Sequence, residues 1–192
     1  MSRRAAQPAG RFPALLLAAL VAFLAGALAV SCGGGGGGGG GPTAPPPPAP
    51  GITFTPGASA GPPGISLAAG AASTANVLLL EVRATGVQDL YGIAFDLQFP
   101  SGVLTYATSS NAGSILSGGA FEISHTATDL VVGVSRLGAV RGVPGDGLIL
   151  TLEFAPTAAG SGSFTFSRNT VLDSTGQPIP VSWTAGSVQV VR

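Results

Sequence analysis

The chain has 192 residues, of which only 8% are charged, and its eight basic and eight acidic side chains cancel to a formal charge of zero. Three of the arginines precede residue 12, so residues 51–192 carry five arginines against eight acids, a formal charge of −3. A mildly acidic region without a cluster of basic residues is atypical of proteins that bind nucleic acid or anionic lipid surfaces. We therefore expect no nucleic-acid partner.

The first 31 residues have the layout of a bacterial export signal. Arg3, Arg4 and Arg11 lie in a segment without acids, and residues 14–30 form an uncharged run rich in Leu and Ala. A basic region followed by an apolar region is typical of a secretory signal. The alternative is a membrane anchor, although the apolar run is slightly shorter than the roughly 20 residues of a spanning helix. We predict a signal peptide over residues 1–31.

The only cysteine directly follows this segment. Ala29-Val30-Ser31-Cys32 resembles the lipobox of bacterial lipoproteins, in which the cysteine is lipidated and becomes the mature N-terminus. Lipidation explains a lone cysteine in an exported chain, because that cysteine has no partner for an internal disulfide. Each buried methylene adds roughly 0.8 kcal/mol, so two or three acyl chains, palmitate among them, would anchor the protein firmly. We predict that Cys32 carries lipid and that this anchor is the only membrane contact.

Residues 32–50 are predicted to be a tether. Nine consecutive glycines at 33–41 are typical of a flexible coil, and the prolines at 45–48 of a stiffer spacer. We expect the protein to be held on the bacterial cell envelope. In an organism with two membranes, Gly33 after the cysteine resembles lipoproteins sent to the outer membrane rather than those retained by an Asp.

Residues 51–192 have the length of one domain, and their hydrophobic pattern predicts β-strands. Apolar residues alternate with small or polar ones over 91–99, 148–154 and 163–167, which is the period of a half-buried strand. Further strands are predicted at 77–84, 103–107, 121–124, 130–135, 181–184 and 187–191. Many short strands without an amphipathic helix indicate an all-β sandwich. The alternation predicts these inward-facing residues: Phe95, Leu97, Phe99, Leu150, Leu152, Phe154, Phe164 and Phe166. In the segment 148–154, Ile149 is expected on the opposite, outer side.

Three motifs along the chain resemble, in their order, segments of one known family of β-sandwich domains. Residues 90–104 resemble the cohesin stretch in which a strand ends at Tyr-Asp-Pro and the next resumes at Val-Leu, although Phe99 replaces the usual Asp before Pro100. Residues 145–154 resemble that family's Gly-x-Gly strand, and residues 172–190 its closing turn and last strand. The resemblance implies a jelly-roll β-sandwich of about nine strands, related in fold to carbohydrate-binding modules. It also implies that the partner is a calcium-loaded dockerin.

Residue patterns that would support catalysis are weak. Residues 57–61 fit Gly-x-Ser-x-Gly, but a nucleophile elbow needs a following helix, which the sequence does not predict. The only histidine, His125, lies at the end of a predicted strand, and Asp146 and Asp173 lie in glycine-rich turns, where a carboxylate usually bonds its own backbone. No pair of acids suggests glycoside hydrolysis, and no residues have the spacing of metal ligands. We predict no catalytic residue, no metal site and no cofactor.

Two binding functions remain open. The first is a protein-interaction module that captures a dockerin-like or other surface protein, in the setting of a polysaccharide-degrading assembly. The second is a polysaccharide-binding module, which needs exposed flat aromatic rings. Trp183 and Tyr106 are the candidates for a small sugar site, whereas Tyr91 alternates with core residues. A structural envelope lipoprotein without a specific ligand is a blander alternative, and we favour the first function.

The resemblance to cohesins also implies which face of the domain binds. In that family the third, fifth, sixth and eighth strands form the sheet that receives the dockerin, and here they correspond to residues 90–99, 121–124, 130–135 and 163–167. The charged candidates, Asp96 and Glu122, would pair with basic residues of a partner. The face is expected to be flat and to bind through hydrogen bonds more than through an apolar plug. Its predicted partner-binding residues are Ala94, Asp96, Gln98, Glu122, Ser124, Val131, Gly133, Ser135, Thr165 and Ser167.

Overall fold

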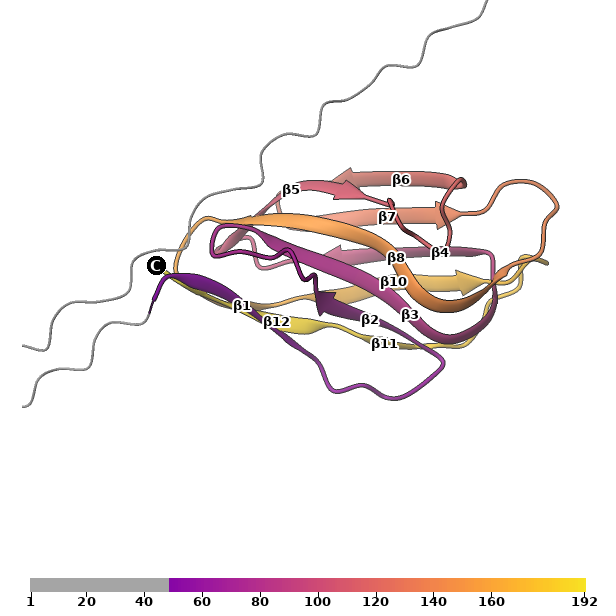
Figure 1. Cartoon of the computed structure of the whole chain (residues 1–192), viewed down its shortest axis with the longest axis horizontal. Helices are drawn as coiled ribbons and strands as arrows, with labels where there is room; N and C mark the ends of the chain where they lie inside the picture. Colours follow the sequence, from indigo (N-terminus) through magenta and orange to yellow (C-terminus); the bar gives the residue numbers. More distant parts are fainter. Residues whose placement is uncertain (1–48) are drawn as a thin grey trace, which may run out of the picture. The chain divides into compact units, whose positions relative to one another are not determined.

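The computed structural model describes residues 49–192, which form twelve β-strands and no helix (Figure 1). The predicted signal peptide, Cys32 and the tether up to residue 48 lie outside the described residues. Within residues 49–192, no helix has the length and apolar character needed to cross a bilayer.

The strands range from 3 to 14 residues in length. Three pairs of consecutive strands are separated by only one residue each, namely Tyr91, Phe164 and Ala185. If each of these pairs is counted as one strand, the domain has nine strands, which is the predicted number. The strands are β1 (Gly51–Pro56), β2 (Gly64–Ala69), β3 (Leu78–Leu90), β4 (Gly92–Gln98), β5 (Leu104–Ser110), β6 (Ala120–His125), β7 (Asp129–Ser135), β8 (Val143–Pro156), β9 (Gly160–Ser163), β10 (Thr165–Leu172), β11 (Ser182–Thr184) and β12 (Gly186–Val191).

Two main sheets enclose the core. One has the strand order β11-β2-β3-β8-β5 and the other the order β10-β4-β7-β6 (Figure 1). A third sheet, β1-β12-β9, continues from them, since β9 leads into β10 and β11 leads into β12. Aromatic side chains from opposite sheets meet between them, such as Phe95 on β4 and Trp183 on β11, whose ring centroids are 5.8 Å apart. The predicted all-β jelly-roll sandwich is confirmed.

The predicted inward-facing residues do form the core. Seven of the eight are at most 4% exposed. The eighth, Phe166, is partly buried and packs against Phe95 and Trp183, at centroid distances of 5.2 and 5.0 Å. Because side chains alternate along a strand, this agreement means that the predicted register of β4, β8 and β10 is right.

Ile149 is an exception to the predicted alternation in β8. It was expected on the outer side, yet it is fully buried. The pairing between β3 and β8 shifts at this point, because Val82 faces Leu150 while the next residue, Arg83, faces Leu148. Ile149 is therefore the extra residue of a β-bulge, and a bulge locally interrupts the alternation of side chains.

Candidate functional site

The strands predicted to share a sheet do so. β4, β6 and β7 lie side by side, and β10 pairs with β4 at one edge. The predicted strand over residues 163–167 is wrong in one respect: Ser163 ends β9 and pairs with Ser187 in the third sheet. Phe164 marks the crossing between the sheets, where its N–H donates to the carbonyl oxygen of Gly186 over 2.9 Å.

The pairing register places the predicted binding residues on one outer face. Ala94 of β4 lies opposite Gly133 of β7, which in turn lies opposite Glu122 of β6. In the next row, Asp96 lies opposite Val131. These positions alternate with inward-facing residues of the same strands, so they all face away from the core. The remaining predicted residues occupy equivalent outward positions in this sheet: Gln98, Ser124, Ser135, Thr165 and Ser167.

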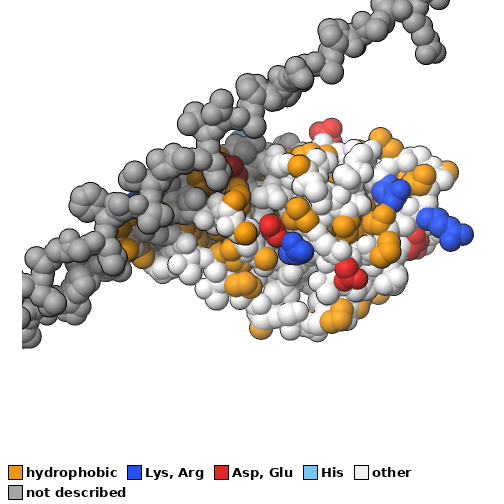
Figure 2. Space-filling view, viewed as in Figure 1, with side chains coloured by type: hydrophobic (Ala, Val, Ile, Leu, Met, Phe, Trp, Pro, Cys, Tyr) orange, Lys and Arg blue, Asp and Glu red, His pale blue; other side chains and the backbone are white. Residues whose placement is uncertain are grey.

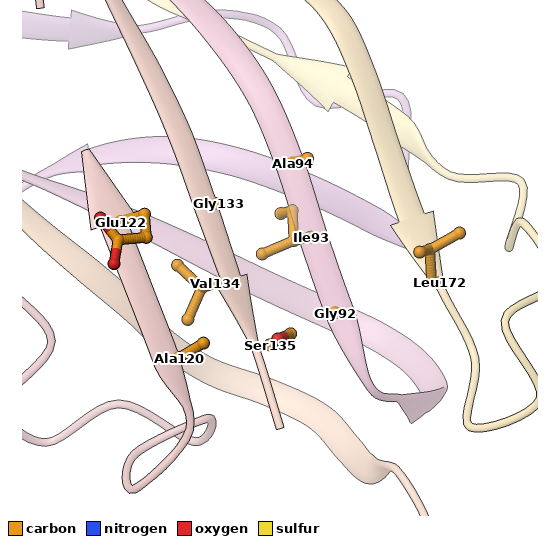
Figure 3. Close-up of a pocket in the computed structure, with 9 residues that line it drawn as sticks. All are labelled: Gly92, Ile93, Ala94, Ala120, Glu122, Gly133, Val134, Ser135 and Leu172. Atoms are coloured by element: carbon orange, nitrogen blue, oxygen red, sulfur yellow. The ribbon is translucent and has the colours of Figure 1, made fainter. Parts of the chain in front are cut away.

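A shallow depression of about 310 Å³ is present in this face (Figure 3). Glu122 and Leu172 lie on its two sides, with Gly92, Ala94 and Gly133 between them (Figure 3). The depression exists because these three central residues have no side chain or only a methyl group. A Cβ built on Gly133 would meet no atom within 4 Å, so the space above this glycine is open. The face is therefore not flat at this point, and the expectation that it binds through hydrogen bonds more than through an apolar plug stays a prediction.

Asp96 is not the free charge that the sequence suggested. It is only 8% exposed, and its carboxylate accepts a hydrogen bond from Nε of Arg168 and forms an ion pair with the same guanidinium. The pairing between β10 and β4 is irregular between Ser167 and Thr170, and Arg168 has a φ of 45°. This bulge positions the Arg168 side chain, which is 79% exposed, next to Asp96. A partner would therefore meet the guanidinium of Arg168 rather than the carboxylate.

Glu122 is the charged residue in the lining of the depression. Its side chain is exposed, and it forms no ion pair or hydrogen bond with any other residue in the range 49–192. An exposed carboxylate beside an apolar hollow can receive an ammonium or guanidinium group, because such a pair loses less solvation than a buried one. Glu122 thus remains the charged candidate for pairing with a partner.

Comparisons with known proteins bear on the fold. No protein-family model matches the sequence, and no curated protein matches it either. Among solved structures, a non-cellulosomal cohesin from the archaeon Archaeoglobus fulgidus matches with a TM-score of 0.53 and 19% identity, over 74% of this chain and 92% of that one. The sixth cohesin of scaffoldin B from Acetivibrio cellulolyticus, solved with a Cel5 dockerin mutant, has a TM-score of 0.53 and 18% identity, over 73% and 99%. The domain has a cohesin-like fold.

A third solved structure agrees with this assignment. A type I cohesin–dockerin complex from Clostridium thermocellum matches the cohesin-like domain with a TM-score of 0.55 and 14% identity, over 73% of this chain and 99% of that one. The resemblance to cohesins that three sequence motifs suggested is therefore confirmed for the fold.

The aromatic residues that could have formed a sugar site are engaged by the cohesin-like domain itself. Trp183 is partly buried against the core. The ring of Tyr106 packs at 5.9 Å from that of Phe154 and 5.1 Å from that of His125. The hydroxyl of Tyr91 donates a 2.7 Å hydrogen bond to the carbonyl oxygen of Gly138. A platform for sugars requires exposed flat rings. Each of these three residues instead packs against, or is hydrogen bonded to, another part of the domain.

The residues considered for catalysis or metal binding are scattered. Residues 57–61 lie in the loop between β1 and β2, so a strand follows the Gly-x-Ser-x-Gly pattern instead of a helix. His125 ends β6 and is exposed. No group of three or more His, Cys, Asp or Glu side chains within residues 49–192 is placed to hold a metal ion.

The two aspartates in glycine-rich turns behave differently from each other. Oδ1 of Asp173 accepts hydrogen bonds from the hydroxyl and N–H of Thr175 and from the N–H of Gln177, at 2.7–2.9 Å. These bonds, the Thr175 hydroxyl foremost, hold the pKa of Asp173 below its ordinary value, and the prediction of a local turn is confirmed. Asp146 instead accepts from the N–H of Gly86, 60 residues away, so the same prediction is wrong for Asp146.

Proposed function

We propose that this protein is a non-catalytic, surface-tethered cohesin-like module that binds a dockerin-like protein through the outer face of the β10-β4-β7-β6 sheet. The observation that carries the proposal is the open apolar depression of that face, with the unpaired carboxylate of Glu122 at its side. Two of the similar cohesins were solved in complex with a dockerin, which supports a protein as the partner. A standard interface buries about 800 Å² on each partner, so it would cover the depression and much of the surrounding sheet.

The depression suggests how such a partner is held. An apolar cavity of about 150 Å³ can hold a benzene molecule. The open depression of about 310 Å³ can therefore admit one large apolar side chain of a partner. Burying a side chain of this size contributes about 1.5–3 kcal/mol. A Lys or Arg beside that side chain would reach Glu122, and this combination defines the expected binding epitope.

Filling the depression is expected to abolish partner capture without unfolding the domain. In Gly133→Leu the new side chain occupies the space of the partner's apolar group, while its Cβ meets no atom within 4 Å. Glu122→Arg is expected to weaken capture as well, because it places a cation where the partner's cation would pair. The measurement is a pull-down of surface proteins on the immobilised full-length chain, followed by titration calorimetry with the purified partner.

Thr151→Arg is the matched control, since Thr151 lies on β8 in the opposite sheet and this change should leave binding intact. Wild-type affinity in Gly133→Leu and Glu122→Arg would exclude this face as the binding site. A panel of insoluble polysaccharides run in parallel tests the second function: binding to a glycan in the absence of any protein partner would assign the domain to carbohydrate recognition.

The tethering part of the proposal rests on the sequence around Cys32. Cys32→Ala is expected to leave an uncleaved precursor or to release the protein from the membrane, because the acyl chains attach to this thiol. Membrane fractionation and mass spectrometry of the mature N-terminus would measure both effects. A wild-type protein that is soluble, with a free thiol at Cys32, would contradict lipid anchoring.

A further inference from the structure

Two large apolar side chains project from the loop between β7 and β8. Leu137 is 63% exposed and Val140 is 42% exposed, and they are two of the three most exposed large hydrophobic residues within residues 49–192. The third, Val131, lies on the outer face of the β10-β4-β7-β6 sheet. A single exposed apolar residue is ordinary, but two large ones in one short loop indicate an interaction surface.

The 136–142 loop is held in place by hydrogen bonds from both of its flanks. The N–H of Arg136 donates a hydrogen bond to the carbonyl oxygen of Tyr91 over 2.9 Å. The hydroxyl of Tyr91 donates a hydrogen bond to the carbonyl oxygen of Gly138 over 2.7 Å. At the other end, the N–H of Gly142 donates to Oδ1 of Asp89 over 2.7 Å. The loop is therefore preorganised to expose its apolar side chains, which reduces the entropy that binding would cost.

Asp89 is itself fixed by its neighbours. Its φ of 55° is unusual for a residue other than glycine, and its Oδ2 accepts hydrogen bonds from the hydroxyl and the N–H of Ser174, at 2.7 and 3.2 Å. These bonds, the Ser174 hydroxyl foremost, lower the pKa of Asp89. The carboxylate thus connects the 136–142 loop to the loop after β10, and the loop's exposed side chains rest on a fixed base.

Two arginines flank the apolar pair. Arg83 and Arg168 each form an ion pair, but Arg136 and Arg141 form none with any residue that the structure describes. Arg141 also lines a groove of about 480 Å³, whose other polar lining residues are Gln88, Asp89 and Ser174. Figure 2 shows basic and apolar side chains gathered at the end of the domain where Figure 1 places this loop. The loop combines exposed apolar groups with unpaired positive charge.

The loop also adjoins the depression. Tyr91, which holds the loop, precedes Gly92, and Arg136 follows Ser135; both Gly92 and Ser135 line the depression. An interface of standard size is larger than the depression alone. A partner that covers the depression and extends past these residues would therefore reach the loop.

We infer that the partner of the sheet face makes a second contact at the 136–142 loop, through a segment that presents apolar side chains next to Asp or Glu. This inference rests on the proposed function. The apolar groups would cover Leu137 and Val140, and the carboxylates would pair with Arg136 and Arg141. An anionic lipid surface fits less well, because residues 51–192 carry a formal charge of −3 and a flat bilayer cannot fill the groove beside Arg141.

The experiment uses the full chain and the partner that the wild-type protein captures. Leu137→Asp and the double variant Arg136→Glu/Arg141→Glu are expected to raise the Kd about tenfold or more, as the loss of an interface hot spot does. Arg192→Glu is the control, since it reverses the charge of one arginine after β12, which is half the charge change of the double variant. A photo-reactive phenylalanine analogue at position 137 should crosslink to a partner peptide that contains Asp or Glu, and mass spectrometry identifies that peptide.

The outcomes separate this inference from the proposed function. If Gly133→Leu loses the partner while the loop variants bind like the wild type, the second contact does not exist and the sheet site stands. If the wild type captures no protein, or if Gly133→Leu captures as well as the wild type, the proposed function fails and the inference fails with it. Vesicles containing phosphatidylglycerol test the lipid alternative in the Cys32→Ala background: binding that Leu137→Asp removes would assign the loop to a membrane and overturn the inference.

Discussion

Replacing Phe154 with Ala is expected to lower the free energy of unfolding by about 3–5 kcal/mol, a large part of the stability of a domain of this size. Phe154 is fully buried, and its ring lies 5.3 Å from that of Phe99, 5.9 Å from that of Tyr106 and 5.5 Å from that of Phe164. Truncation removes these contacts and leaves a cavity among side chains that the strands hold in place. Urea denaturation followed by circular dichroism measures the loss.

Phe166→Ala is the comparison for this prediction. Phe166 is only partly buried, so its truncation should cost less than that of Phe154. An unchanged midpoint of unfolding in Phe154→Ala would mean that the register of β8 is wrong by one residue, because such a slip turns every side chain to the other face.

The sequence predicts the core well where strands are regular. Phe95 and Leu97 on β4, and Phe99 directly after it, alternate with smaller or polar residues, and all three are buried as expected. The pattern fails at Ile149, because a β-bulge depends on how β3 and β8 pair, and pairing is a property of two segments far apart in the chain. Periodicity along one strand contains no information about an extra residue opposite another strand.

The sequence likewise predicts one part of the candidate site and does not predict another. The alternation in β4 correctly places Ala94 and Asp96 on the outer face, and the resemblance to cohesins correctly groups the four strands. The sequence does not predict the depression, because Leu172, Gly92 and Gly133, which line it, come from three neighbouring strands. Leu172 comes after the irregularity of β10, so its position could not be read from the pattern of residues 163–167. Small residues gathered across strands become visible only in three dimensions.

Asp96 is the position where sequence and structure lead to opposite predictions. From the sequence, Asp96→Arg would abolish partner capture and leave the fold intact. In the structure this substitution places a second guanidinium beside Arg168, at a position that is only 8% exposed. We therefore expect Asp96→Arg to destabilise the domain by about 2 kcal/mol. Breaking a fully buried pair costs about 3–5 kcal/mol, and the cost is smaller here because Arg168 is largely exposed and solvent screens its charge.

A double-mutant cycle separates this charge effect from a change in packing. Asp96→Arg combined with Arg168→Asp restores opposite charges, so the double variant should recover part of the stability that Asp96→Arg loses. Asp96→Asn should cost less than Asp96→Arg, because an amide can still accept a hydrogen bond from the guanidinium. Equal unfolding midpoints for wild type and Asp96→Arg would show that the ion pair contributes nothing to the fold. Asp96→Arg thus changes both the stability of the domain and the charge of the face, whereas a loss of partner capture in Gly133→Leu would report on the face alone, because the added Cβ has open space there.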